Sequence, residues 1–76
     1  MPTLRDLRKQ ALLSSTELAG AMQVSRKAVW EWERAQSRPS PAHQRRLVVL
    51  LKVSPAELLQ ALEETAKEGK KERAAA

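Results

Sequence analysis

Apolar residues recur along the chain at intervals of three and four, which is the spacing of one face of a helix. Leu4, Leu7 and Ala11 form the first such stripe, and comparable stripes follow in four later segments. No stretch alternates between apolar and polar residues with the period of two that is typical of a β-strand. The pattern predicts an all-α protein of five helices, at about residues 3–12, 15–22, 26–35, 41–51 and 55–67.

Polar residues that cap helices precede the predicted segments. Thr3 with Asp6, and Ser14 with Glu17, have the spacing of a capping box, in which two side chains bind backbone N–H groups at a helix start. Ser25 begins the third segment, and a serine–proline pair opens each of the last two, where proline suits the first helical position. These caps support the assignment of five helices.

The chain has room for one small domain, since it contains 76 residues with a mass of 8.5 kDa. We expect this domain to span residues 1–68, because Gly69 is expected to end the fifth helix. Residues 69–76 would then form a flexible tail of basic residues and alanine.

Composition argues against several classes of protein. The chain has no cysteine, which excludes disulfides and thiolate metal sites, and the single histidine, His43, lacks partners for zinc. No apolar run approaches the roughly 20 residues that span a bilayer, and no signal peptide is visible. No nucleophile–base pair or metal-ligand spacing occurs. We therefore expect a cytoplasmic protein that is not an enzyme and needs no cofactor, metal or membrane.

Positive charge is concentrated in the middle of the chain. The net charge is +5, and residues 25–46 alone carry six basic against two acidic residues, a net +4. Residues 47–76 carry five of each sign. A polyanion could bind this central segment. The alternative is a solvated basic surface that keeps a small protein soluble.

Residues 14–40 contain two short predicted helices joined by a turn of about three residues. Ala19 is small where the two helices would cross, and Val24, in the turn, must be buried for them to pack at a steep angle. This spacing is typical of a helix-turn-helix unit, in which the outer face of the second helix can enter a DNA groove.

The chain resembles the lambda-repressor-like, Cro/XRE-type helix-turn-helix domains over about residues 4–62. The resemblance is carried by the pattern L-S-x-x-E-L-A-x-x-M-x-V-S-R-x-x-V-x-x-W-E-R, followed by R-P-S, a helix and V-S-P-x-E-L-L. It implies a compact five-helix domain whose second and third helices form the helix-turn-helix.

The chain departs from the family at four positions. The family often has glycine where this chain has Gln23, Ala35 and Lys52, and it tends to be apolar where this chain has Gln44. If the first three positions keep a positive φ, each costs on the order of 1 kcal/mol. The alternative is that these turns are reshaped.

The helix at 26–35 holds the first candidates for reading DNA bases. Helical geometry turns Val29 and Trp32 inward, which leaves Arg26 and Lys27 outward in the first turn. In this docking mode the first turn meets base edges, and either side chain could donate to guanine O6 and N7. The alternatives are a phosphate contact or an exposed surface charge.

Trp30 and Glu31 complete the base-reading candidates. Trp30, two residues from Trp32, lies on the other face, where it contacts a thymine methyl group or a sugar–phosphate edge, stacks under an arginine, or meets a partner protein. Glu31 matches a base-reading position of the family and could accept from cytosine N4. Alternatively, it pairs with Lys27 or Arg34.

Four residues are candidates for phosphate binding. Ser15 and Thr16 add hydroxyl groups to the N–H groups at the start of the helix over 15–22, where the helix dipole also favours an anion. Arg34 lies on the outward side of the helix at 26–35. Arg38, in the following loop, matches a family position that often contacts phosphate.

The resemblance also implies an ion pair between Arg8 and Glu33, whose positions usually pair in the family. The pair would link the first helix to the end of the third. The alternative is two unrelated, solvated charges.

Leu58, Leu59 and Leu62 form an apolar stripe that is larger than one helix needs to dock against so small a core. We expect part of this stripe to be exposed and to form a dimer interface. In the dimer, the helices at 26–35 of the two copies, the recognition helices that enter the DNA groove, would lie about one DNA turn, ~34 Å, apart. The alternative is that all three leucines pack inward and that the protein is a monomer that pairs only on DNA.

These features predict a sequence-specific, double-stranded DNA-binding transcriptional regulator, a repressor that acts as a homodimer on a palindromic operator in the nucleoid. One alternative is the antitoxin of a toxin–antitoxin pair, which would bind its operator and a toxin. Another is a protein–protein adaptor on the same fold, although several basic residues on the outward face of the third helix argue against it.

Overall fold

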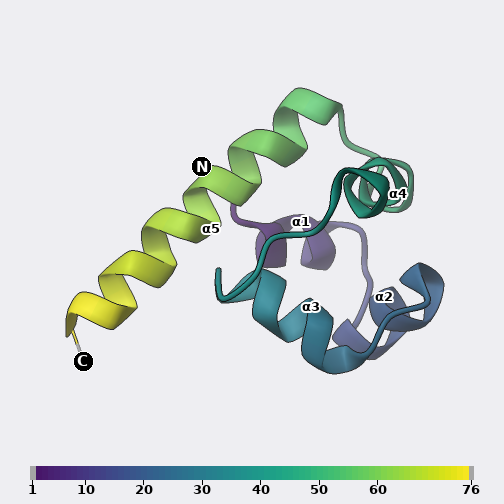
Figure 1. The fold of residues 1–76 in the computed structure, drawn as a ribbon. Helices are drawn as coiled ribbons and strands as arrows, with labels where there is room; N and C mark the ends of the chain where they lie inside the picture. Colours follow the sequence, from purple (N-terminus) through teal and green to yellow (C-terminus); the bar gives the residue numbers. More distant parts are fainter. Residues whose placement is uncertain (1, 76) are drawn as a thin grey trace.

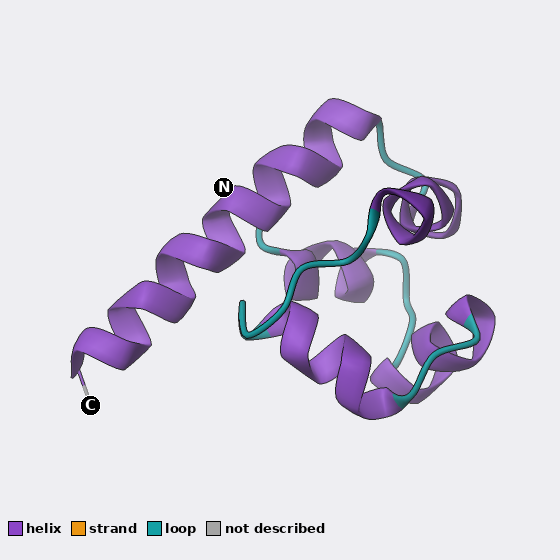
Figure 2. Ribbon diagram, viewed as in Figure 1, coloured by secondary structure: helices purple, strands orange, loops and turns teal. Residues whose placement is uncertain are grey.

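The computed structural model describes residues 2–75 of the chain, and side chains over residues 2–69. The helices are α1 (Leu4–Gln10), α2 (Ser15–Met22), α3 (Arg26–Glu33), α4 (Pro41–Leu51) and α5 (Pro55–Ala75) (Figure 1). No strand occurs among residues 2–75 (Figure 2). The predicted all-α fold of five helices is therefore confirmed.

The predicted helix starts are formed by the expected side chains. In α1 the Asp6 N–H donates to Thr3 Oγ1 at 3.3 Å, and the Thr3 N–H donates to Asp6 Oδ2 at 3.0 Å. Ser14 and Glu17 make the same reciprocal pair at α2, at 3.1 and 3.0 Å. The backbone N–H of each capping residue lowers the pKa of its carboxyl partner, because the bond stabilises the carboxylate.

The core lies where α1, α2 and α3 meet α4 and the first half of α5. Trp32 and Val29 point into it with 5% and 0% of their surface exposed, as predicted. Val24, in the turn, is half-buried against the same core. The remaining buried apolar residues are Leu4, Leu7, Leu18, Ala19, Met22, Leu47, Leu51, Leu58, Ala61 and Leu62.

Among residues 2–75, four non-glycine residues have a left-handed backbone. Gln23, Ala35 and Lys52, where the family often has glycine, have φ of 59°, 59° and 55°. The turns therefore keep the glycine geometry rather than being reshaped. Leu12, with φ 60°, was not anticipated. A left-handed backbone at Leu12 and at Ala35 cannot continue a right-handed helix, so α1 and α3 each end two residues earlier than predicted.

Gln44 stands in a half-buried position that the family tends to fill with an apolar residue. Its side-chain Nε2 donates to the backbone oxygen of Pro39 at 2.9 Å. The polar group is therefore satisfied, which explains how the helix α4 tolerates an amide there.

The fifth helix is longer than predicted, because Gly69 does not end it. α5 continues to Ala75, so residues 69–75 of the expected tail are helical, and Ala76 lies outside the described residues. Gly69 is buried against the end of α3. A Cβ at Gly69 would lie 2.9 Å from Ala35 Cβ and 3.0 Å from the Arg34 carbonyl oxygen. Here glycine permits a close approach of two elements rather than a helix stop.

Candidate nucleic-acid interface

α2 and α3 form a helix-turn-helix unit at the edge of the domain (Figure 1). The left-handed Gln23 ends α2, and the Val24 N–H donates to the Ala19 carbonyl at 3.0 Å. Ser25, whose own backbone is extended, then starts α3, because its Oγ accepts from the Ala28 N–H at 3.1 Å. Ala19, predicted to lie where the two helices cross, is 3% exposed.

The outer face of α3 carries most of the predicted DNA-contacting side chains. Arg26, Lys27, Trp30 and Arg34 are exposed, and Glu31 is half-buried. Arg26, Trp30 and Arg34 are four residues apart and so form one row along the helix. Because the opposite face of α3 is in the core, this row is the side that a DNA groove could receive.

Trp30 lies under the guanidinium of Arg34. The Arg34 Cζ is 5.0 Å from the ring centroid, within cation–π distance, and Trp30 remains 47% exposed. The stacking alternative considered for Trp30 is thus the geometry of the DNA-free protein. The exposed part of Trp30 is accessible to a ligand.

Glu31 does not form the predicted alternative pair with Lys27 within the described side chains. Its backbone oxygen accepts from the Gln36 N–H at 2.9 Å and from the Ser37 N–H at 3.4 Å. These bonds close the end of α3.

The four phosphate candidates lie in three places. Ser15, Trp30 and Arg34 line one polar hollow beside the outer face of α3. Arg38 lines a separate hollow with Trp32 and Leu62. Thr16 is exposed on α2, in neither hollow.

Arg5 is a further basic side chain beside this face that sequence reasoning missed. It is exposed on α1 and lines the same hollow as Ser15 and Arg34. The sequence shows only that Arg5 lies on the polar side of an amphipathic helix. Its proximity to α3 depends on the tertiary packing of α1, which no local pattern carries.

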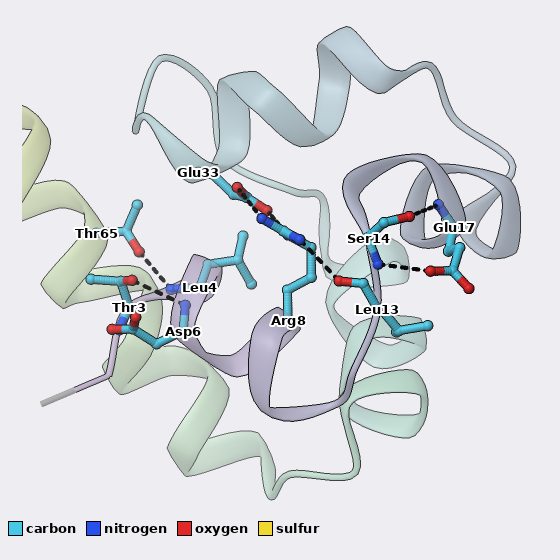
Figure 3. Close-up of polar contacts among 9 residues, drawn as sticks. All are labelled: Thr3, Leu4, Asp6, Arg8, Leu13, Ser14, Glu17, Glu33 and Thr65. Carbon is cyan, nitrogen blue, oxygen red and sulfur yellow. Dashed lines mark hydrogen bonds and ion pairs between the residues drawn. The ribbon is translucent and has the colours of Figure 1, made fainter.

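Arg8 joins α1 to the end of α3, as the resemblance implies (Figure 3). Its Nε donates to Glu33 Oε2 at 2.6 Å, and its Nη2 lies 3.4 Å from Oε1. Its Nη1 donates to the Leu13 carbonyl at 2.9 Å. Both charged side chains are 11% exposed. The two charges are therefore neither unrelated nor solvated.

The apolar stripe of α5 is buried more fully than the dimer hypothesis predicts. Leu58 and Leu62 are 1% and 6% exposed, so the expectation that they contribute to a dimer interface is wrong. They are covered by the protein's own core, since α5 packs against α1 and α4. Leu59 is 44% exposed and borders an apolar hollow between α4 and α5, with Pro41, Val48 and Pro55.

The described part of the chain contains neither a cluster of metal-ligating residues nor a membrane-spanning helix. No group of three or more His, Cys, Asp and Glu residues there could hold a metal ion. His43 is half-buried and its ring lies against Trp32, with centroids 5.3 Å apart. No helix within the described residues has both the length and the apolar character to cross a membrane.

A family model described as a helix-turn-helix domain matches residues 3–62 of the chain. The chain therefore belongs to the helix-turn-helix domain family, in agreement with its resemblance to Cro/XRE-type domains. Such a domain is a DNA-binding module of regulators, so DNA is the partner that membership indicates. No curated protein and no solved structure gives a significant match.

Proposed function

We propose that this protein is a transcriptional regulator, acting as a repressor, that binds double-stranded DNA sequence-specifically with α3 in the major groove. The single observation that carries the proposal is the exposed row of Arg26, Trp30 and Arg34 on the second helix of a helix-turn-helix. The other face of that helix is anchored in the core by Val29 and Trp32. A helix held in this way can enter a groove without unfolding.

Base reading is assigned to the first turns of α3. Arg26 and Lys27 would donate to guanine O6 and N7, and Glu31 would accept from the N4 amino group of cytosine. Trp30 would cover a thymine methyl group or a sugar edge with the exposed part of its ring. These contacts lie on neighbouring helical turns and so would read adjacent base pairs.

Phosphate binding is assigned to residues at the rim of this surface. Ser15 and Thr16 would bind one strand at the start of α2, with backbone N–H groups of the same turn. Arg34 would extend the row of α3 to the backbone, and Arg38 would bind a phosphate beyond it. Such contacts fix the register of the protein on DNA and carry no sequence information.

We further propose that the protein binds a palindromic operator as a homodimer. One such domain contributes only about 600–1,000 Å² of interface with DNA, and a second copy doubles the contacts. The supporting observation is the exposed Leu59 beside the apolar hollow formed with Val48 and Pro55. An antitoxin or an adaptor would bind a different protein, rather than a second copy of itself, at the same hollow.

The dimer is tested by sedimentation at micromolar concentration. Leu59→Glu should shift the protein to a monomer and weaken its affinity for a palindromic site. Leu12→Glu is the matched control, because Leu12 is 88% exposed and does not line the hollow. A monomeric wild-type protein, together with an unchanged affinity for Leu59→Glu, would rule out this interface.

The function itself is tested by selecting binding sites from random duplex DNA. We expect enrichment of a palindromic sequence, with an affinity that falls steeply as salt increases because phosphates release counterions. Selection that enriches no sequence, although the protein is folded, would contradict the proposal. Capture of a toxin encoded beside the gene would favour the antitoxin instead.

A further inference from the structure

Residues 63–75 lie beyond the part of the chain that the family model matches, yet they continue α5 without a break. Figure 1 shows this half of α5, green to yellow, leaving the core and passing the end of α3.

The buried stripe of α5 continues into this segment. Leu58, Ala61 and Leu62 are followed by Thr65, which is 3% exposed, and then by the buried Gly69. These positions recur at intervals of three and four and so lie on one side of the helix. The inward face of α5 therefore extends seven residues beyond the matched region.

Thr65 attaches this segment to α1. Its Oγ1 accepts the Leu4 N–H at 2.9 Å (Figure 3). It also donates to the Ala61 carbonyl at 2.8 Å. The Leu4 N–H is in the first turn of α1, where backbone donors have no partner within the helix. A side chain of α5 thus caps the start of α1.

Gly69 attaches the same segment to α3. The absence of a side chain allows α5 to approach Ala35 Cβ and the Arg34 carbonyl oxygen so closely that a Cβ would be 2.9 and 3.0 Å from them. Ala35 is the left-handed residue that follows the end of α3. The end of α3 is therefore held by two contacts, the close packing of Gly69 and the Arg8–Glu33 pair.

We propose that the second half of α5 sets the position of the recognition helix, with Gly69 as a positioning residue for DNA binding. Trp30 lies in the last turn of α3 and Arg34 caps its end, next to the backbone that Gly69 contacts. A displacement of that backbone moves both side chains relative to Ser15 on α2. The inference rests on the proposed function, since it concerns how α3 is presented to DNA.

The test compares two replacements of a helical glycine by alanine. Gly69→Ala places a methyl group against Ala35 and Arg34, whereas at Gly20, in α2, nothing lies within 4 Å of the added Cβ. Both changes increase helix propensity, so Gly20→Ala controls for that effect. We expect Gly69→Ala to weaken binding to the selected site by roughly two- to thirtyfold. Binding of Gly20→Ala should match the wild type.

Two further readouts separate positioning from a general loss of stability. Binding of Gly69→Ala to random DNA should change little, because phosphate contacts at α2 remain. In the free protein, amide NMR shifts of residues 30–34 should change in Gly69→Ala and not in Gly20→Ala. The double variant Ala35→Gly/Gly69→Ala removes the closest contact and should regain affinity for the selected site.

Wild-type affinity and unchanged amide shifts in Gly69→Ala would overturn the inference. If Gly69→Ala loses its helical circular dichroism signal, the double variant decides: refolding with near wild-type affinity supports the contact, and failure to refold overturns it. If the wild-type protein binds no duplex, the proposed function fails. The amide shifts of the DNA-free variants still decide whether Gly69 positions α3.

Discussion

Replacing Arg8 by alanine should destabilise the protein by far more than an exposed ion pair contributes. The guanidinium donates at 2.6 Å to Glu33 and at 2.9 Å to the Leu13 carbonyl. A second contact with Glu33 is longer, at 3.4 Å. Both charged side chains are 11% exposed, so water replaces little of what is lost. One side chain thus connects α1, the α1–α2 loop and the recognition helix.

The magnitude follows from the geometry of this pair. A hydrogen bond to a charged group contributes about 1.5–3 kcal/mol, and breaking a fully buried pair costs about 3–5 kcal/mol because one charge stays uncompensated. With slight exposure of both partners, we expect Arg8→Ala to lower the free energy of unfolding by about 2–4 kcal/mol. For a domain of this size the melting temperature should fall by roughly 10–25 °C.

Thermal and urea unfolding, followed by circular dichroism, measure this effect. Arg5→Ala is the matched control, because Arg5 is exposed on the same helix, and its effect should stay within about 0.5 kcal/mol. Arg8→Met/Glu33→Leu should recover much of the lost stability, since an apolar pair replaces both charges. Equal melting temperatures for Arg8→Ala and Arg5→Ala would refute the reasoning, as would strictly additive effects of Arg8→Ala and Glu33→Ala.

Three further outcomes are expected. Leu12→Gly should raise the free energy of unfolding by about 0.5–1 kcal/mol in urea titrations, because it relieves a left-handed φ at a side chain that is 88% exposed; an unchanged midpoint would show that unfolded-state entropy cancels the gain. Backbone N–H groups hold the pKa values of Asp6 and Glu17 below their ordinary 3.8 and 4.5, so their contribution to stability should be complete above about pH 5 and lost as the pH falls through the lower folded pKa values. Asp6→Asn/Glu17→Gln should flatten that part of the stability–pH curve, and an identical slope would contradict the assignment. Arg38→Ala should weaken binding to all DNA sequences alike and reduce the salt slope by about one unit, whereas a loss confined to one sequence would make Arg38 a base contact.

Local patterns predicted the features whose partners are close in sequence. The Ser14–Glu17 capping box joins residues three apart, and the apolar spacing of α3 turned Val29 and Trp32 inward. The family's frequent glycine at the position of Gln23 left a positive φ there as one of two alternatives, and the structure has it. In each case the physical cause lies within one or two helical turns.

The family resemblance supplied one contact between distant residues, the Arg8–Glu33 pair, but other features that depend on a distant neighbour were missed. Gly69 has the same local signal whether it ends a helix or allows close packing, and only the approach of Ala35 decides between them. The spacing of Leu58 and Leu62 shows an apolar face but not which element covers it. Arg5 came beside α3 only through the packing of α1.

The most direct test of the central claim is a measurement of affinity for every single-base variant of the selected operator. The wild-type protein is compared with Arg26→Ala/Lys27→Ala at one fixed salt concentration. If α3 reads bases in the major groove, the double variant loses discrimination at two or three adjacent base pairs in each half-site, at about 1–3 kcal/mol for each lost contact, and retains it elsewhere. A uniform loss of affinity at every position, with the wild-type order of preferences intact, would contradict the account.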